Sequence, residues 1–227
     1  PQSAEFGCCG FHVPTQNFVN SFKTGADGLP LLDTYNDANY VAAADPVDPR
    51  LDHTVVQQGK PFKYDPAYIA QGDPWARDPA TYGNYASMKE LEHPDCPCRA
   101  ANGPFTITSK NDVLMRYSDV LLWKAEALIE LGRQGEALPI INEIRARAAN
   151  SVGRLNGAGI YNVQPYAVFA SQDHARQALR FERRLELGLE GHRFFDLVRW
   201  GIAKQWLDGY LSVERTRRSY LNDANFQ

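Results

Sequence analysis

Residues 179–201 read LRFERRLELGLEGHRFFDLVRWG, and this stretch decides the fold of the second half of the chain. Large apolar residues recur three or four positions apart among arginines and glutamates, which is the pattern of a helix with one buried face. Ser171 can cap this helix, which we expect to end near Glu190. Its predicted inner face consists of Ala178, Phe181, Leu185 and Leu189. Gly191 then allows a break before another helix.

A second helical block precedes this stretch. Residues 115–148 read MRYSDVLLWKAEALIELGRQGEALPIINEIRARA and predict two helices joined at Gly132 and Gly135. The predicted apolar face of the first helix, Met115–Leu131, consists of Tyr117, Val120, Leu121, Ala125 and Leu128. The predicted face of the second helix consists of Ala137, Ile140, Ile141 and Ile144, with Pro139 in or beside its first turn. The length and the small residues resemble a tetratricopeptide hairpin, and a generic helical hairpin is the alternative.

The first half of the chain has a different character. Twelve of the fourteen prolines in the whole chain lie before Lys110, together with thirteen aromatic residues. Several Asp-Pro pairs in this half favour extended turns. We expect a helix near Thr15–Phe22 that begins at a capping Thr15, and a short strand at Leu51–Gln57. The sequence therefore predicts a loop-rich region at 1–113 and a helical region at 114–227.

Composition excludes several classes of partner. The chain has 227 residues, a formal net charge of −3 and 44% apolar residues, with both signs of charge interspersed. This balance argues against nucleic acid or an anionic membrane surface as the main partner. No apolar run approaches the ~20 residues that a membrane-spanning helix needs.

These blocks together resemble the C-terminal part of the SusD/RagB family. The segments at 115–148 and 179–201 carry most of the resemblance, and PTQNFVNSFKTGADGLPL at 14–31 and DPRLDHTV at 48–55 add to it. The resemblance implies a mainly α fold, with a tetratricopeptide-like helical hairpin scaffold, long irregular loops and little β structure. It also implies that regions 1–113 and 114–227 form one C-terminal domain, with the N-terminal half of a family member absent.

The functional implications of the resemblance are specific. It implies non-catalytic capture of oligosaccharide at the surface of the outer membrane, and delivery to a SusC-like TonB-dependent transporter. It implies no cofactor, and contact with the membrane only through a lipid anchor outside this chain. A peptide-capturing member of the same family and a tetratricopeptide-like protein-interaction scaffold are the alternatives; a glycosidase is the least favoured reading.

Clustered carboxylates are the main argument for catalysis. Glu182, Glu186 and Glu190 lie four apart on one predicted helix face, where paired carboxylates could perform acid–base chemistry. Arginines at helical spacing, together with the Asp196–Arg199 pair, favour a structural ion-pair lattice instead. The sequence also lacks a nucleophile motif, a phosphate loop and a dinucleotide fingerprint. We therefore expect no catalytic residues.

Aromatic loops are the better candidates for a ligand site. Sugar C–H faces stack on aromatic rings, and sugar hydroxyls pair with amide, carboxylate and guanidinium groups. The first candidate cluster consists of Trp75, Arg77, Asp78, Tyr82, Asn84 and Tyr85. The second consists of Phe6, Phe11 and Asn17. The alternative is that these aromatics only hold long loops against the helices.

Four cysteines occur as two tight pairs, Cys8–Cys9 and Cys96–Cys98. Neighbouring cysteines rarely bridge each other without strain, so disulfides between the two pairs are the expected oxidised arrangement. Zinc is an alternative, because Cys9-x2-His12 and His93-x2-Cys96 have the spacing of ligand pairs. We expect no metal.

Overall fold

The chain is divided into two compact units in this computed structural model. The structure describes residues 6, 10–89, 91–103, 105–155 and 159–222. The first unit comprises residues 1–189 and the second comprises residues 190–227. The predicted change from loops to helices near residue 113 lies inside the first unit.

Helices dominate the described residues, and the strands are short and paired only in twos. The helices are α1 (Gln16–Asn20), α2 (Arg50–Thr54), α3 (Pro79–Tyr82), α4 (Tyr117–Glu130), α5 (Gln134–Asn150), α6 (Gln172–Glu186), α7 (His192–Arg199) and α8 (Ala203–Arg217). The 3-10 turns are η1 (Asp73–Trp75), η2 (Ser151–Arg154) and η3 (Ser219–Leu221). The strands are β1 (Pro46–Val47), β2 (Val55–Val56), β3 (Pro61–Phe62), β4 (Asp65–Ile69), β5 (Ala86–Ser87), β6 (Arg99–Asn102), β7 (Phe105–Thr108) and β8 (Ile160–Tyr161). The expected mainly α fold with little β structure is confirmed.

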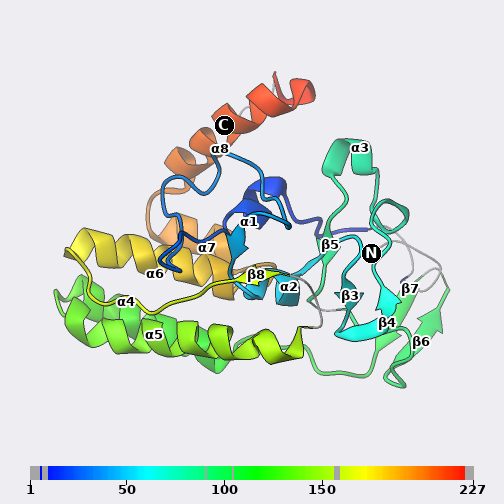
Figure 1. Ribbon diagram of the computed structural model, residues 1–227, viewed down its shortest axis with the longest axis horizontal. Helices are drawn as coiled ribbons and strands as arrows, with labels where there is room; N and C mark the ends of the chain where they lie inside the picture. Colours follow the sequence, from blue (N-terminus) through cyan, green and yellow to red (C-terminus); the bar gives the residue numbers. More distant parts are fainter. Residues whose placement is uncertain (1–5, 7–9, 90, 104, 156–158, 223–227) are drawn as a thin grey trace. The chain divides into compact units, whose positions relative to one another are not determined.

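Three helices form the main helical layer of the first unit. α4 and α5 make the predicted hairpin, and α6 packs beside both (Figure 1). Ser171 caps α6 as expected, because its hydroxyl accepts a hydrogen bond from the backbone N–H of His174 at 3.0 Å. α6 ends at Glu186 and not near Glu190. The buried core between the helices includes Leu122, Ala125, Ile129, Ala137, Ile141, Ile144, Ala175, Ala178 and Leu179.

The predicted inner face of α4 is right for Ala125, which is buried, and for Leu121 and Leu128, which pack against the core, but it is wrong for Tyr117 and Val120. Leu122, Ala125 and Ile129 are fully buried, whereas Tyr117 is 71% exposed and Val120 is 41% exposed. Periodicity alone does not distinguish a stripe through Val120 from one through Leu122, and packing against α5 and α6 selects the second. On α5, the predicted residues Ala137, Ile141 and Ile144 are buried, and Pro139 lies inside the helix beyond its first turn.

The loop-rich part is anchored by small helices. The hydroxyl of Thr15 accepts from the backbone N–H of Phe18 at 3.1 Å, which confirms the predicted cap of α1. Gly188, just after α6, allows Phe18 to pack closely: a Cβ at this position would lie 2.2 Å from Phe18 Cζ. The predicted strand at Leu51–Gln57 is wrong, because the chain forms α2 first and only then β2. The Asp48 carboxylate, accepting from the backbone N–H of Arg50, starts that helical turn.

Two further hydrophobic clusters lie under the loops. One joins Val19, Phe22, Tyr40, Val47, Leu51 and Val55 to Phe181 and Leu185 of α6. The other comprises Phe6, Val56, Phe62, Ala70, Trp75, Ala86 and Met88. Strands β2, β3 and β5 contribute Val56, Phe62 and Ala86 to this second cluster. The antiparallel β6–β7 hairpin lies at the same end of the first unit (Figure 1).

The second unit is a helical segment. Gly191, with φ +82°, precedes α7 and provides the predicted break after α6. Leu197 is buried, whereas Phe194, Phe195 and Val198 are exposed. Asp196 pairs with Arg199 at 2.8 Å, which confirms an expected intrahelical ion pair.

Candidate ligand-binding surface

The two aromatic clusters predicted from the sequence meet in one place. The ring of Phe6 lies 5.0 Å from that of Trp75 and 5.0 Å from that of Phe62, between centroids. Tyr68 completes the group, with its ring 5.6 Å from Trp75. Pairs of aromatic rings at these separations each contribute about 0.5–1.5 kcal/mol beyond the burial of their area. Segments distant in sequence are therefore fixed against one another by a shared aromatic interior.

Two of the predicted site residues lie within this interior. Trp75 is 4% exposed and Phe6 is 7% exposed. Neither ring presents a face to solvent, so their contribution in this structure is to support the loops above them. This is the outcome that the sequence left open as its alternative for individual aromatic residues.

Other predicted residues are exposed and adjacent. The guanidinium carbon of Arg77 lies 5.3 Å from the centroid of the Phe11 ring, which is 71% exposed. This cation–π contact joins the Phe6–Phe11 segment to the Trp75–Tyr85 loop a second time. It also places a flat apolar ring beside a planar cluster of hydrogen-bond donors, which is a combination suited to a sugar.

The short helix α3 shapes the rest of this loop. Asp78, at φ +44°, caps the helix by accepting from the backbone N–H of Thr81 at 3.3 Å. Pro79 follows at the first helical position, where its fixed φ suits the helix. The exposed ring of Tyr82, at 47% exposure, ends the turn. We call the exposed residues Phe11, Arg77, Asp78 and Tyr82 the loop surface.

The remaining predicted residues contact the scaffold. Tyr85 is half-buried, and its hydroxyl donates to Gln16 Oε1 at 3.2 Å. Burial raises the pKa of Tyr85, and the hydrogen bond to Gln16 opposes that shift. Asn17 is buried and its Oδ1 accepts from Arg184 Nη2 at 2.6 Å. Asn84 is half-buried. Tyr85 and Asn17 thus hold α1 in place.

Sequence reasoning missed a small pocket beside the α2 segment. Its empty volume is about 300 Å³, which includes the part of the pocket that opens to solvent. Its lining residues are Asp52, Val55, Lys60, Pro61, Tyr64, Met88, Leu155 and Tyr161. These come from five separate segments, and a spacing pattern within one segment could not have revealed them. The sequence signal was limited to the Asp48-Pro49-Arg50 motif just upstream.

The carboxylate of Asp52 organises this pocket. It accepts from Lys60 Nζ at 2.6 and 2.9 Å, and from the side chains of Gln57 and Tyr161. Burial, together with the hydrogen bond to Asp52, raises the pKa of Tyr161 well above its ordinary value. Tyr161 is therefore a neutral donor across the physiological pH range. The pocket wall is a satisfied polar network that does not depend on a ligand.

A tyrosine–histidine–serine chain lies next to the pocket. His53 Nδ1 is 2.9 Å from the Tyr64 hydroxyl, and Nε2 is 2.8 Å from Ser151 Oγ. Ser151 donates its own proton to the carbonyl of Ala148 at 2.6 Å, so its oxygen accepts from His53. Burial lowers the pKa of His53, which keeps the ring neutral. An activated serine needs the histidine as acceptor, and the hydrogen bonds here run in the opposite direction.

The clustered carboxylates of α6 are held in buried ion pairs. Glu182 contacts Arg50 at 2.6 Å and Arg145 at 3.2 Å, and its side chain is fully buried. Glu186 contacts Arg50 at 3.2 Å and Arg116 at 2.5 Å, and it also pairs with Arg147. The lattice expected from the sequence is present, but the partners of both glutamates come from other segments. In addition, Arg183 contacts Asp119 of α4 at 2.8 Å.

The charges in this lattice strongly lower the pKa of one carboxyl group, that of Glu186. Burial alone would raise the pKa of Glu186, but the positive charges of Arg50 and Arg116 outweigh it and hold the pKa well below 4.5. The group therefore remains ionised and paired. A general acid needs a raised pKa and access to substrate, and this environment provides neither.

The cysteines follow a different arrangement from the expected one. Cys96 and Cys98 form a disulfide with each other, with their Cα atoms 5.2 Å apart, so the predicted bridge between the two pairs is wrong for these residues. Pro97 between them, in a tight turn, brings the two sulfur atoms within bonding reach. Cys8 and Cys9 lie outside the described residues. His93 contacts Asp65 at 3.3 Å, and its ring packs 4.9 Å from that of Tyr68.

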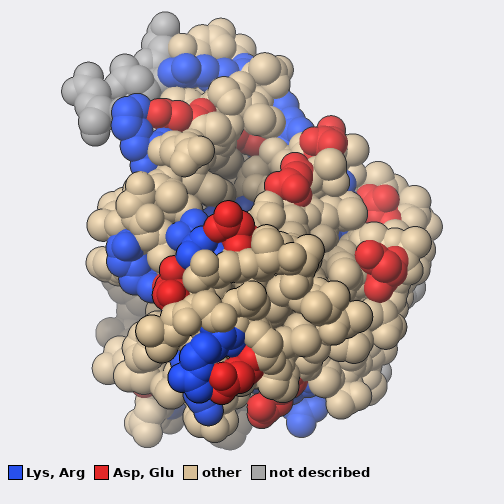
Figure 2. Space-filling view, turned by 90° about the vertical axis from the view of Figure 1, so that its left-hand side faces the viewer, with Lys and Arg blue, Asp and Glu red and all other residues tan. Residues whose placement is uncertain are grey.

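Surface charge is mixed. Figure 2 shows basic and acidic groups of limited size separated by neutral surface on the face it draws. Within the described residues, no helix combines the length and the apolar character that crossing a membrane requires. The mixed charge on this face agrees with a partner that carries little net charge.

Comparisons with known proteins agree with one another. The stretch of similarity to the SusD-like protein P38 of Formosa agariphila is 98 residues long and 40% identical, and it covers 43% of this chain and 18% of P38. SusD-like protein P25 of the same organism is 35% identical over 101 residues, which cover 44% of this chain and 17% of P25. The matched stretch is thus less than a fifth of each relative.

Solved structures show the same fold. A SusD superfamily protein from Bacteroides vulgatus matches 92% of this chain with a TM-score of 0.55 and 22% identity, over 39% of its own length. A SusD-like protein from Bacteroides fragilis matches 85% of this chain with a TM-score of 0.55, over 37% of its length. The model of the SusD family, SusD_RagB, matches residues 1–225. The chain therefore belongs to the SusD/RagB family.

Proposed function

We propose that this chain captures oligosaccharide at the outer membrane surface without altering it chemically. The bound sugar would then pass to a SusC-like TonB-dependent transporter, with membrane attachment through a lipid anchor outside this chain. Membership of the SusD family, over residues 1–225, is the observation that carries the proposal. It supports a nutrient-binding role in polysaccharide utilisation, and the loop surface adds a chemically suitable place.

The loop surface has the chemistry that a neutral sugar requires. Phe11 and Tyr82 offer exposed rings to C–H faces, and Arg77 and Asp78 offer a donor and an acceptor to hydroxyls. The buried rings of Phe6 and Trp75 support this segment from below. A preorganised support reduces the entropy that ligand binding must otherwise overcome. We propose Asn84 and Tyr85 as residues at the edge of the same site.

The chemistry of the polar clusters supports binding without turnover. The α6 glutamates are buried among arginines, and His53 donates to Ser151 instead of activating it. Incubation of pure protein with oligosaccharides, followed by chromatography, tests this directly. Hydrolysis that is lost in a Glu186→Gln variant would contradict it.

Calorimetry against a panel of neutral glycans tests capture. We expect Phe11→Ala and Tyr82→Ala each to weaken binding of the best ligand by about two- to tenfold, since an aromatic contact is typically worth about 0.5–1.5 kcal/mol. Phe105→Ala and Tyr117→Ala remove exposed rings elsewhere and serve as matched controls. Equal losses in all four variants, or binding unaffected by the first two, would move the site away from the loop surface.

A protein-interaction scaffold is the second candidate function. It is favoured by exposed apolar side chains on and before α4: Val113, Leu114, Met115, Tyr117, Val120 and Trp123. Exposed apolar patches of this kind mark contact surfaces in many proteins. Panels of peptides in the same calorimeter separate a scaffold or peptide-capturing role from glycan capture, and copurification of a large barrel protein from membranes tests the transporter partnership. Peptide binding without glycan binding would favour the second candidate.

A further inference from the structure

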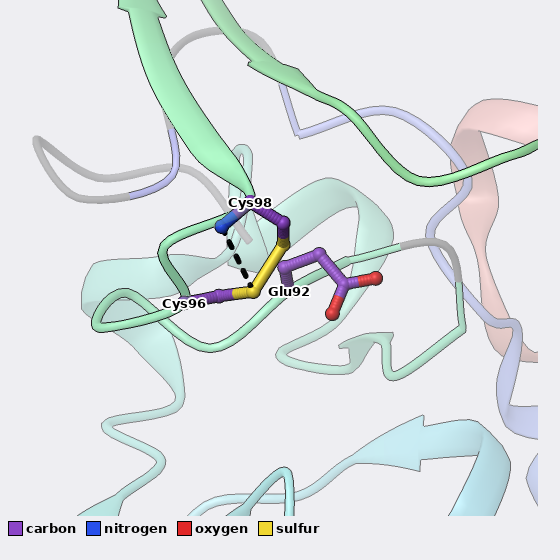
Figure 3. A group of neighbouring side chains, drawn as sticks. All are labelled: Glu92, Cys96 and Cys98. Atoms are coloured by element: carbon purple, nitrogen blue, oxygen red, sulfur yellow. Dashed lines mark hydrogen bonds between the residues drawn. A yellow bond between two sulfur atoms is a disulfide. The ribbon is translucent and has the colours of Figure 1, made fainter.

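A cluster of metal-ligating side chains lies apart from the loop surface, at the base of the β6–β7 hairpin. It consists of Glu92, Cys96 and Cys98 (Figure 3). One carboxylate oxygen and the two sulfur atoms all lie within 4.8 Å of one another. The three side chains are half-buried, so they are reachable from solvent. In the structure, the two sulfurs are joined as a disulfide.

We propose that Glu92, Cys96 and Cys98 form a redox-gated site for a thiophilic divalent cation, with Zn²⁺ as the representative. The disulfide closes the site, because bonded sulfurs have no thiolate to offer. A dithiol reductant opens it: the two thiols of the reductant are oxidised to a disulfide, and their two electrons and two protons convert the Cys96–Cys98 bond into two thiols. A phosphine does the same with one molecule of water, which supplies the protons while the phosphine becomes its oxide. The cation then displaces these two protons and binds two thiolates and the Glu92 carboxylate.

The donor set suits such a cation. Two thiolates and one carboxylate give three protein ligands, which leaves the fourth position of a tetrahedron for water. A soft sulfur pair disfavours Mg²⁺ and Ca²⁺, which prefer sites made of oxygen atoms. The net charge of the three ligands, −3, exceeds that of the cation and provides the attraction.

The backbone around the cysteines is already arranged for ligation. The N–H of Cys98 donates to Cys96 Sγ at 3.4 Å, drawn as the dashed line in Figure 3, and such a donor stabilises a thiolate. The N–H of Cys96 donates to the carbonyl of His93 at 2.9 Å, and that of Arg99 to the carbonyl of Cys96 at 3.0 Å. The two backbone-to-carbonyl bonds do not involve the sulfur atoms, so the turn keeps its shape when the disulfide is reduced.

The carboxylate and the hairpin are held by neighbouring groups. Lys110 Nζ donates to Glu92 Oε2 at 2.5 Å, and the lysine is more than half exposed. A ligand carboxylate is commonly oriented by such an outer hydrogen bond. The N–H of Ser109 donates to the carbonyl of Cys98 at 2.9 Å, which ties β7 to the cysteine turn. Lys110 therefore orients Glu92 through one oxygen while the other can ligate.

His93 provides a matched control from the same turn. Its ring nitrogens face Asp65 at 3.3 Å and Asp95 at 3.8 Å, and the ring packs against Tyr68. The geometry thus selects Glu92 where spacing alone had suggested His93 as the partner of Cys96. The two residues are adjacent in sequence, so they share solvent access and backbone context.

Titration with Co²⁺ tests the site, because tetrahedral thiolate coordination gives it an intense visible absorption. The background is the full chain carrying Cys8→Ser and Cys9→Ser, which leaves only the Cys96–Cys98 pair. After reduction by a phosphine, we expect one equivalent of Co²⁺ to bind and Zn²⁺ to displace it. The oxidised protein should give no such band. Circular dichroism of each variant checks that the fold is intact.

Variants then assign the ligands. Cys96→Ser or Cys98→Ser should abolish the visible absorption of thiolate-bound Co²⁺. Glu92→Gln should weaken the affinity for Co²⁺ by about tenfold or more. His93→Gln should leave the affinity unchanged. The proposal is overturned if the reduced, folded protein binds no stoichiometric Co²⁺. It is also overturned if Glu92→Gln binds as tightly as the parent, or if His93→Gln is the variant that loses the metal.

Discussion

At the scale of single residues, the aromatic loops show what a sequence can and cannot reveal. Composition pointed to two aromatic segments, and the structure brings them together where Arg77 of one contacts the ring of Phe11 of the other. Composition does not show which ring faces inward, since that depends on the packing of Phe62 of β3 and Tyr68 of β4 against Trp75. Burial of an aromatic residue is decided by tertiary contacts, and the local pattern of a loop carries no period from which to infer it.

Trp75 and Phe11 should therefore behave oppositely on substitution. We expect Trp75→Ala to cost about 3–5 kcal/mol in the free energy of unfolding, the usual penalty for emptying a buried aromatic site. Phe11→Ala should change stability by less than about 0.5 kcal/mol, as exposed positions generally do. Denaturant unfolding of both variants measures the difference. Similar midpoints for the two would show that Trp75 is not part of the interior.

At the scale of elements, helices were predictable and their orientations were less so. The predicted helix caps at Thr15 and Ser171 are confirmed. A hydroxyl just before a stretch with helical apolar spacing can accept a hydrogen bond from a backbone N–H three residues later, so this feature depends on local sequence alone. The segment after Asp48 was misread as a strand, since its β-branched residues come after a short helix fixed by the Asp48–Arg50 contact. Arg50 also donates to Glu182 of α6, 132 residues away, and a local sequence pattern does not reveal such a distant partner.

The buried face of α4 gives a clear test at this scale. Leu122→Ala should cost about 2–5 kcal/mol, because this side chain is fully buried between helices. Val120→Ala, which the sequence alone placed on the inner face, should cost under about 1 kcal/mol, given that Val120 is 41% exposed. Thermal or denaturant melts of the two variants decide between the faces. A larger loss for Val120→Ala would restore the face predicted from periodicity.

At the scale of the whole molecule, the ion-pair lattice connects parts of the first unit that are far apart in sequence. Arg50 of α2 reaches Glu182 and Glu186 of α6, and Arg145 of α5 reaches Glu182 from another side. A buried ion pair is weak evidence for net stability, but removal of one partner leaves the other charge buried and unpaired, which is strongly destabilising. The sequence predicted ion pairs for these glutamates, but with arginines of the same helix as their partners, because periodicity describes neighbours within one helix only.

Removal of Arg50 tests the lattice. Arg50→Met keeps the approximate length of the side chain but leaves Asp48 and Glu182 without their shared partner. We expect a loss of about 3–5 kcal/mol in the free energy of unfolding, typical of a broken buried pair. Arg133→Ala removes an arginine from an exposed pair with Glu136 and should shift the unfolding midpoint little. Equal shifts in the two variants would mean that the buried pairs are as weak as surface ones.

Glu186 adds a dependence on pH. Its pKa lies below 4.5 in the folded chain and near the ordinary value of about 4.3 when unfolded. The unfolded state therefore binds the proton first, so the stabilisation is complete above the unfolded pKa and is lost as pH falls through the folded one. We expect Glu186→Gln to be clearly less stable than the parent at pH 7, and the gap to narrow steadily below about pH 4.5. Denaturant melts from pH 7 to pH 3 measure this gap. A gap that stayed constant with pH would mean that the arginines around Glu186 do not favour its charged form over the neutral one.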